Sequence, residues 1–252
     1  MATVQVSFYT KTRGWKRDLI EIATGRDYDS FVSSTIPTPS NYFQFVYEFI
    51  EHFNNTNRIC EEAIRHSINS PFEETRDNPI YTYTKVSLIN DNYSTYLSSA
   101  EKCAISKILY DYSTELQEPN YNSGLITEIR DKCKKDKIIN KDPYSFITKY
   151  CCHHNPNYYP IYDSYVDIML KWYSDLEQFP FTIAENNMDF SDYDSFCGAL
   201  EQFKECCEAD ISIESISFRD IDKFLWSAGK SFFNPYINKE MYENYKNNPA
   251  LY

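Results

Sequence analysis

A lysine and an aspartate, Lys149 and Asp163, are the residues of this sequence whose types and spacing most clearly allow chemistry. Residues 143–154 follow a capping aspartate, begin with proline and end at an Asn-Pro pair, so they predict a helix that carries Lys149. Asp163 comes soon after the helix breaker Pro160 and is the predicted N-cap of the next helix. The adjoining helix ends are expected to bring the amine and the carboxylate into one pocket, where a partly deprotonated amine can attack carbon.

The helix that follows Asp163 is predicted from its apolar stripe. One face of residues 164–177 carries Val166, Met169, Leu170, Tyr173 and Leu176. On local grounds alone, a lysine on an amphipathic helix is a solvated residue, and an aspartate N-cap stabilises its helix by about 1 kcal/mol. These structural interpretations stand beside the chemical one.

Three stretches around these two residues resemble a known family. They are Thr148-Lys149, then Pro160-Ile161-Tyr162-Asp163 followed by Ser164-Tyr165-Val166, and SFRDIDKFLWSAGK at residues 217–230. They are similar to the catalytic segment and the closing helix of the helix-hairpin-helix DNA glycosylase superfamily. Within it they resemble the 8-oxoguanine DNA glycosylase-like branch, in a divergent bacterial form. The resemblance covers roughly residues 95–230.

The resemblance implies a DNA glycosylase that excises a modified or damaged base, extending to AP lyase activity, and protection against foreign DNA is one role for such an enzyme. It makes Lys149 the candidate nucleophile and Asp163 the candidate catalytic carboxylate. The target base would be flipped from the stack into an aromatic pocket. Four aromatic residues are candidates for stacking on that base, with a place in the core or at the rim as the alternative for each: Tyr158, Tyr159, Tyr162 and Trp226.

The net charge of -12 and the pI near 4.8 argue against a general nucleic-acid binder, because nonspecific DNA affinity comes largely from lysine and arginine. A local basic cluster at residues 130–141 runs against this average. The related family has a glycine-containing hairpin at that place, which grips a DNA phosphate, and this chain has no glycine there. We expect Lys134, Lys135 and Lys137 to make the phosphate contact instead; a solvated helix face is the alternative.

Eight cysteines and a Cys-Cys-His-His run at residues 151–154 raise the questions of disulfides and metal. The N-terminal residues form no hydrophobic signal segment, so reduced thiols and a cytoplasmic location are expected. Consecutive helical residues point about 100° apart, so at most two residues of the run could share a metal, and neither a metal site nor a cofactor is expected. No window reaches the roughly 18 apolar residues of a membrane span.

The low glycine count, 5 in the whole chain, and the repeated apolar spacing of three and four residues predict a mainly α protein. With the resemblance, we expect a helix-hairpin-helix glycosylase-like bundle with a small N-terminal strand portion. Residues 1–92 are expected to form an N-terminal lobe of short strands and helices, and residues 93–252 a glycosylase-like helical lobe. One compact domain over residues 1–252 is the alternative.

Individual elements follow from local signals. A strand is predicted at 3–9, a strand or an extended segment at 80–88, and a loop at 178–191. Helices are predicted at 40–54, 57–69, 123–135 and 193–208. Another helix follows the capping box of Ser98 and Glu101. Ser217 caps the last clear helix, which is expected to stop at Gly229. The expected buried stripe of residues 40–54 is Phe43, Tyr47, Ile50 and Phe53.

Two function classes follow from these observations. The first is the DNA glycosylase described above. The second is a binding module that keeps the scaffold, has lost the DNA chemistry and engages a protein partner through its acidic surface. If Lys149 and Asp163 face one basic-lined cleft, the enzyme is favoured; a lysine in bulk solvent or an acidic cleft favours the binding module.

Overall fold

The computed structural model describes most of the chain, including every residue of the predicted catalytic segment. The described residues are 3–5, 7–10, 14–36, 42–69, 79–118, 121–135, 139, 141–176, 179–184, 188–209, 216–233 and 236–247. Of the sites predicted above, Lys137 lies outside these residues.

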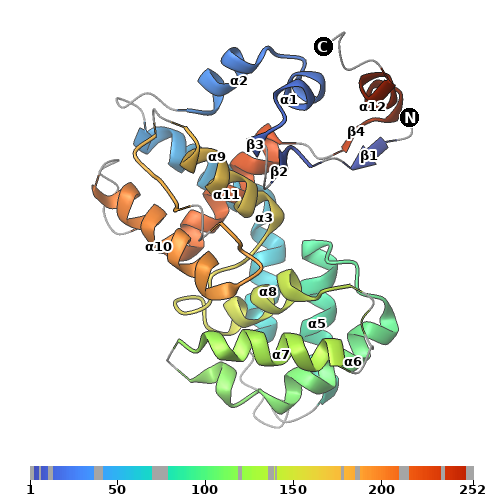
Figure 1. Cartoon of the computed structure of the whole chain (residues 1–252). Coiled ribbons are helices and arrows are strands. Elements are labelled where there is room, and N and C mark those ends of the chain that lie inside the picture. The colour runs from blue at the N-terminus through green and yellow to red at the C-terminus, as the bar shows by residue number, and fades with distance from the viewer. Residues whose placement is uncertain are drawn as a thin grey trace.

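The protein is mainly helical, as the sequence predicts. The helices are α1 (Arg17–Thr24), α2 (Tyr28–Thr35), α3 (Tyr42–Ile68), α5 (Pro79–Tyr93), α6 (Ser99–Asp111), a 3-10 turn at Glu115–Gln117, α7 (Ser123–Lys135), α8 (Tyr144–His154), α9 (Ser164–Ser174), α10 (Tyr193–Ala209), α11 (Phe218–Phe232) and α12 (Lys239–Asn247). Figure 1 shows α9, α10 and α11 in the upper half of the molecule and α5, α6 and α7 in the lower half, with α3 running between them. No described helix combines the length and the apolar character of a bilayer span.

Among the described residues, four short strands form two antiparallel pairs near the chain ends. β1 (Thr3–Gln5) pairs with β4 (Tyr236–Asn238), and β2 (Tyr9–Thr10) pairs with β3 (Gly14–Trp15). The strand predicted over residues 3–9 is therefore two short strands, each joined to a different partner. The loop predicted at 178–191 has no helix or strand in its described residues.

An aromatic cluster packs on the helix that Asp163 begins. Trp172 of α9 is fully buried. Its ring lies 4.8 Å from that of Trp15, 5.4 Å from Phe31 and 5.3 Å from Phe233, measured between centroids. Segments from both ends of the chain thus pack against α9.

The strand predicted at residues 80–88 is wrong, because this segment lies within α5. The alternating Ile, Tyr, Thr and Val residues suggested a strand, but β propensity depends on context and burial. The buried positions of α5 are Thr82, Val86, Ile89 and Asn90, a helical spacing that faces its neighbouring helices. α5 packs against α3, α6 and α8.

The two helices predicted at 40–54 and 57–69 are one continuous helix, α3. Its buried face is also shifted from the predicted stripe. Phe43 and Tyr47 are 53% and 40% exposed, whereas Tyr42 and Val46 are buried together with Ile50 and Phe53. α3 packs against α11 and α5, so tertiary burial carries the helix through the asparagine pair at 54–55.

The predicted signals at several other helix ends are confirmed. Ser98 and Glu101 form a reciprocal capping box at the start of α6, and Ser217 accepts the Asp220 N–H at the start of α11. The predicted helices at 123–135 and 193–208 are α7 and α10. All five predicted positions of the stripe at 164–177 are buried, although α9 ends at Ser174 and Leu176 follows it.

Gly229 does not end α11, which continues to Phe232. A Cβ at this position would lie 2.7 Å from the backbone oxygen of Tyr165 and 2.9 Å from its Cβ. The absence of a side chain at Gly229 therefore allows α11 to pack closely against α9. This contact sets the distance between α11 and the first turn after Asp163.

Candidate active site around Lys149 and Asp163

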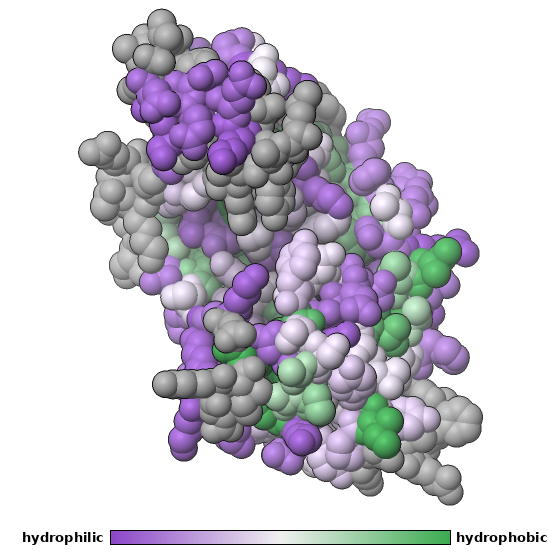
Figure 2. Space-filling model, turned by 90° about the vertical axis from the view of Figure 1, so that its right-hand side faces the viewer, coloured by the Kyte–Doolittle hydropathy of each residue, from purple (hydrophilic) through white to green (hydrophobic). Residues whose placement is uncertain are grey.

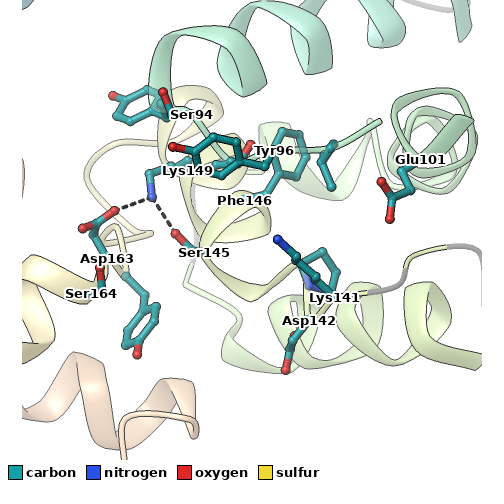
Figure 3. A pocket seen from close by; sticks show the side chains of 15 residues that line it. Ser94, Tyr96, Glu101, Lys141, Asp142, Ser145, Phe146, Lys149, Asp163 and Ser164 are labelled. Carbon is teal, nitrogen blue, oxygen red and sulfur yellow. Dashed lines mark hydrogen bonds and ion pairs between the residues drawn. The ribbon is translucent and has the colours of Figure 1, made fainter. Parts of the chain in front are cut away.

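Lys149 and Asp163 meet at the junction of α8 and α9, as predicted. The Lys149 side chain is only 2% exposed, and its Nζ lies 2.8 Å from Oδ2 of Asp163, whose side chain is 15% exposed. The other carboxylate oxygen accepts the backbone N–H of Tyr165 at 3.0 Å, so Asp163 is also the N-cap of α9. One carboxylate thus caps a helix and pairs with a buried amine (Figure 3).

Two further groups surround the amine. Nζ of Lys149 donates to Oγ of Ser145 at 2.6 Å, from one turn earlier on α8. The ring of Tyr93, at the end of α5, has its centroid 5.5 Å from Nζ. The lysine side chain is therefore held between a carboxylate, a hydroxyl and an aromatic face.

Thr148 joins α8 to the segment that ends at Asp163. Its hydroxyl donates to the backbone oxygen of Ser145 at 3.1 Å and accepts the backbone N–H of Tyr162 at 3.1 Å. The threonine before Lys149 therefore fixes the residue before Asp163. The Thr148 hydrogen bonds thus position the segment before Asp163, while the adjacent Lys149 contacts Asp163 itself.

The start of α8 differs by one residue from the prediction. Pro143 occupies the N-cap position rather than the first helical one, and Asp142 accepts the backbone N–H of Tyr144 at 3.2 Å. Asp142 also pairs with Arg130 and with Lys134, whose Nζ is 3.0 Å from its carboxylate. The aspartate therefore ties the end of α7 to the start of α8 as well as satisfying a helix N–H.

Two neighbouring cavities open around the Lys149–Asp163 pair. The first, of about 390 Å³, is lined by Lys149, Asp163, Ser145, Phe146 and Tyr162 and, at its other end, by Lys141 and Glu101 (Figure 3). The second, of about 420 Å³, is lined by Trp226, Lys230, Phe53, Tyr165 and Asp163. Both are also lined by Tyr93, Ser94, Tyr96 and Ser164, which places the candidate carboxylate on their shared wall.

A buried network of charged and polar groups lies behind this wall. The Tyr93 hydroxyl donates to Glu61 at 2.6 Å, and it lies 3.0 Å from Nε2 of His153. Arg219 of α11 donates to that hydroxyl at 2.8 Å and to Glu61 at 2.7 Å, and it pairs with Asp222. The tyrosine that faces Lys149 is therefore anchored from three helices.

The pKa values in this network reflect burial and charge. Burial raises the pKa of Asp222 to about 6, and the negative charge of Asp163 adds to the shift while Arg219 and Lys149 oppose it. Burial lowers the pKa of His153 to about 4, with a further lowering from Arg219. His153 is therefore neutral at pH 7, and Asp222 is electrostatically coupled to the Lys149–Asp163 pair.

The two cysteines of α8 are buried, and its two histidines are partly buried. All eight cysteines are free thiols, and burial raises the pKa of Cys152 to about 12. His153 is held by Tyr93. Across the described ranges no group of three or more His, Cys, Asp or Glu side chains is arranged to hold a metal ion.

The four aromatic candidates for stacking occupy different places. Tyr159 is fully buried, Tyr158 is partly buried, and neither lines the two cavities. Tyr162 lines the first cavity and donates its hydroxyl to Asp167 at 2.8 Å. Trp226 lines the second cavity, with Nζ of Lys230 4.5 Å from its ring centroid. The structure thus brings two of the four aromatic residues to the Lys149 site.

The two predicted phosphate contacts that the structure describes, Lys134 and Lys135, line neither cavity. Lys134 is paired with Asp142, and Lys135 is exposed at the end of α7. Lys141, at the end of the predicted basic cluster, lines the first cavity, and Lys230, outside that cluster, lines the second. Both cavities therefore carry cationic and acidic residues together.

Sequence reasoning missed three residues that hold the amine and its surroundings. Ser145 lies one helical turn before Lys149, so its contact could have been found from the predicted helix. Tyr93 and Arg219 are 126 residues apart, and no local pattern connects them. Their contact depends on how α5 and α11 meet.

Comparisons with known proteins cover part of the site. Residues 43–158 match a family model, HI_0787_N, described as an N-terminal domain. A Haemophilus influenzae protein (strain ATCC 51907 / DSM 11121 / KW20 / Rd), described as an uncharacterized protein, is 37% identical over 90 residues, which make up 36% of this chain and 38% of that protein. The similarity thus spans well under half the length of this relative. No solved structure matches significantly.

Proposed function

We propose that this protein is a DNA glycosylase that excises a modified or damaged base, with Lys149 as the nucleophile and Asp163 as the catalytic carboxylate. The observation that carries the proposal is the 2.8 Å contact between the buried amine and the carboxylate on a cavity wall. A lysine side chain that is almost fully buried is not a solvated surface residue. Its carboxylate partner is a group that can accept its proton. The family resemblance supplies the substrate class.

The reaction needs the neutral amine. Asp163 accepts a proton from Nζ of Lys149, and the nitrogen lone pair then attacks C1′ of the deoxyribose. A bond forms between Nζ and C1′, the C1′–N glycosidic bond breaks, and the base leaves with the bonding electrons and takes up a proton. Opening of the sugar ring gives a Schiff base, which water hydrolyses to release the amine.

The surroundings of Lys149 suit this chemistry. Ser145 and Asp163 fix the direction of Nζ, and Thr148 holds the backbone beside Asp163. The first cavity lies against the same side chains and has Tyr162 on its wall. A flipped base placed there would meet an aromatic ring while its sugar faced the amine.

A binding module that engages a protein partner is the second candidate function. The net charge of -12 favours the binding module, because acidic surface repels the phosphates of DNA. Figure 2 shows that hydrophilic residues cover much of one face and that hydrophobic ones appear there only in small separate patches. A partner of such a module would carry basic residues, and the Lys149–Asp163 pair would then be a buried ion pair alone.

Borohydride trapping separates the two functions. The wild-type protein is incubated with a duplex that carries one abasic site and then reduced, which converts a Schiff base into a stable protein–DNA adduct. If the protein is the enzyme, we expect an adduct that Lys149→Gln abolishes. The control Lys107→Gln, at an exposed lysine that lines neither cavity, should retain it. No adduct and no base release from a panel of modified duplexes, together with recovery of a basic protein partner, would establish the binding module.

A further inference from the structure

Tyr96 stands at the rim shared by the two cavities. It lines both of them and is 74% exposed, although most tyrosines near the site are buried or half-buried. Tyr96 and Lys149 both line the first cavity (Figure 3). Nζ of Lys141 lies 6.0 Å from the ring centroid, so a cation also stands beside this aromatic face.

The backbone around Tyr96 is strained. Its φ is +59°, and that of Ser94 is +51°. These two are the non-glycine residues with positive φ among the residues described. A side chain with a Cβ atom is disfavoured in this conformation, and glycine would adopt it freely. The sequence therefore places a tyrosine where the fold alone favours glycine.

Asn90 holds the strained segment in place. Its side-chain oxygen accepts the backbone N–H of Leu97 at 2.7 Å and the hydroxyl of Thr95 at 2.9 Å, and its backbone oxygen accepts the N–H of Thr95 at 3.2 Å. Asn90 itself is buried at the end of α5. Strain that surrounding contacts hold in this way is characteristic of functional sites.

We propose that Tyr96 is a stacking residue for an unpaired base of DNA held against Lys149. An exposed aromatic ring with a cation beside it suits the π-face of a base and the phosphate next to it. The ring lies at the rim, so it contacts a base adjacent to the reacting sugar rather than one inside the first cavity. This inference rests on the proposed function and adds the residue that holds the strand at the mouth.

The test measures DNA binding and stability on the same variants. The probe is a fluorescent duplex in which a tetrahydrofuran residue, which cannot form a Schiff base, replaces one nucleotide and leaves the opposite base unpaired. We expect Tyr96→Gly to bind roughly 5- to 150-fold more weakly, from the usual contribution of stacking on one base. Tyr96→Phe keeps the ring and is expected to bind within about twofold of wild type.

Thermal melting distinguishes stacking from a structural role. Since glycine relieves the positive φ, Tyr96→Gly should melt at the wild-type temperature or higher. Tyr47→Ala, at another exposed tyrosine that lines neither cavity, is the control and should bind as wild type does. A Tyr96→Gly protein that melts well below wild type would show that the ring supports the fold instead.

The outcomes for the two proposals differ. If wild type binds the duplex and Tyr96→Gly binds equally well, the stacking role is overturned and the glycosylase proposal stands. If wild type does not bind the duplex even at low salt, the glycosylase proposal fails and the stacking role fails with it.

Discussion

Lys149 and Asp163 lie on consecutive helices, 14 residues apart, and their side chains meet at 2.8 Å with little exposure to solvent. Removing one charge of a buried pair destabilises a protein more than removing both. The remaining charge keeps its desolvation penalty and has lost its partner. This relationship makes the pair testable independently of any substrate.

A double-mutant cycle measures the coupling within this pair. Lys149→Met is expected to destabilise the protein by roughly 3 kcal/mol, since it leaves a shielded carboxylate unpaired. Asp163→Asn keeps the N-cap of α9 and removes only the charge, so adding it to Lys149→Met should recover part of the loss, with a coupling of about 0.5–3 kcal/mol. Urea unfolding gives the four free energies. Additive effects would mean that the side chains are not paired in solution.

Two glycines provide a matched test of how closely α9 and α11 approach. Gly229→Ala would place a Cβ 2.7 Å from the Tyr165 backbone, so a loss of about 1–3 kcal/mol is expected as the helices move apart. Gly198→Ala in α10 has no atom within 4 Å of the added Cβ and should stabilise its helix by roughly 0.5–1 kcal/mol. Thermal or urea unfolding checks both signs. Equal effects would contradict the close contact of α9 and α11.

Local signals were enough to predict the Lys149–Asp163 contact. The caps and breakers around α8 and α9 lie within a few residues of each helix end, so the sequence alone sets both helices and the short loop between them. The stripe of α9 likewise has a strict helical period. The contact needs no information from distant parts of the chain.

The rest of the site depends on tertiary structure. α5 was predicted as a strand because its residues alternate and are β-branched or aromatic, and burial against three helices overrides that preference. Tyr93 is the last residue of α5, and Tyr96 lies just after it. Their positions at the cavities therefore depend on a helix where the sequence predicts a strand. Arg219 lies in the predicted closing helix, yet its partner Glu61 is 158 residues away.

The neutral state of His153 predicts a pH dependence of stability. Its pKa falls from 6.5 to about 4 on folding, chiefly through burial, so between these values the unfolded chain binds a proton that the folded protein does not. The resulting stability is fully present above pH 6.5 and is lost as the pH falls towards 4. When the pH is lowered from 7 to 5, the free energy of unfolding of wild type should therefore fall by about 2 kcal/mol more than that of His153→Gln.

Urea unfolding at the two pH values gives this difference. The opposite contribution of Asp222, whose pKa rises on folding, is present in both proteins and cancels to first order. Parallel losses in wild type and His153→Gln would show that His153 is accessible to protons in the folded state.

Charge reversal tests whether the basic cluster at residues 130–141 contacts DNA. Changing Lys134, Lys135 and Lys137 to glutamate is expected to abolish binding of the tetrahydrofuran duplex, and wild-type affinity should fall with salt with a log-log slope of about -0.9 for each phosphate contacted. The charge-matched control changes Arg58, Arg65 and Lys246, which are exposed and line neither cavity. Equal losses in the two variants would indicate a response to net charge alone.

The central claim is that Nζ of Lys149 attacks the sugar, and peptide mapping of the borohydride-reduced adduct tests it most directly. Mass spectrometry of the digested adduct identifies the lysine that carries the sugar fragment. The proposed mechanism predicts the modification on Lys149, and it predicts that Asp163→Asn slows its formation while α9 keeps its cap. Modification of Lys141 or Lys230 in place of Lys149, or an adduct that forms equally fast in Lys149→Gln, would contradict the mechanism.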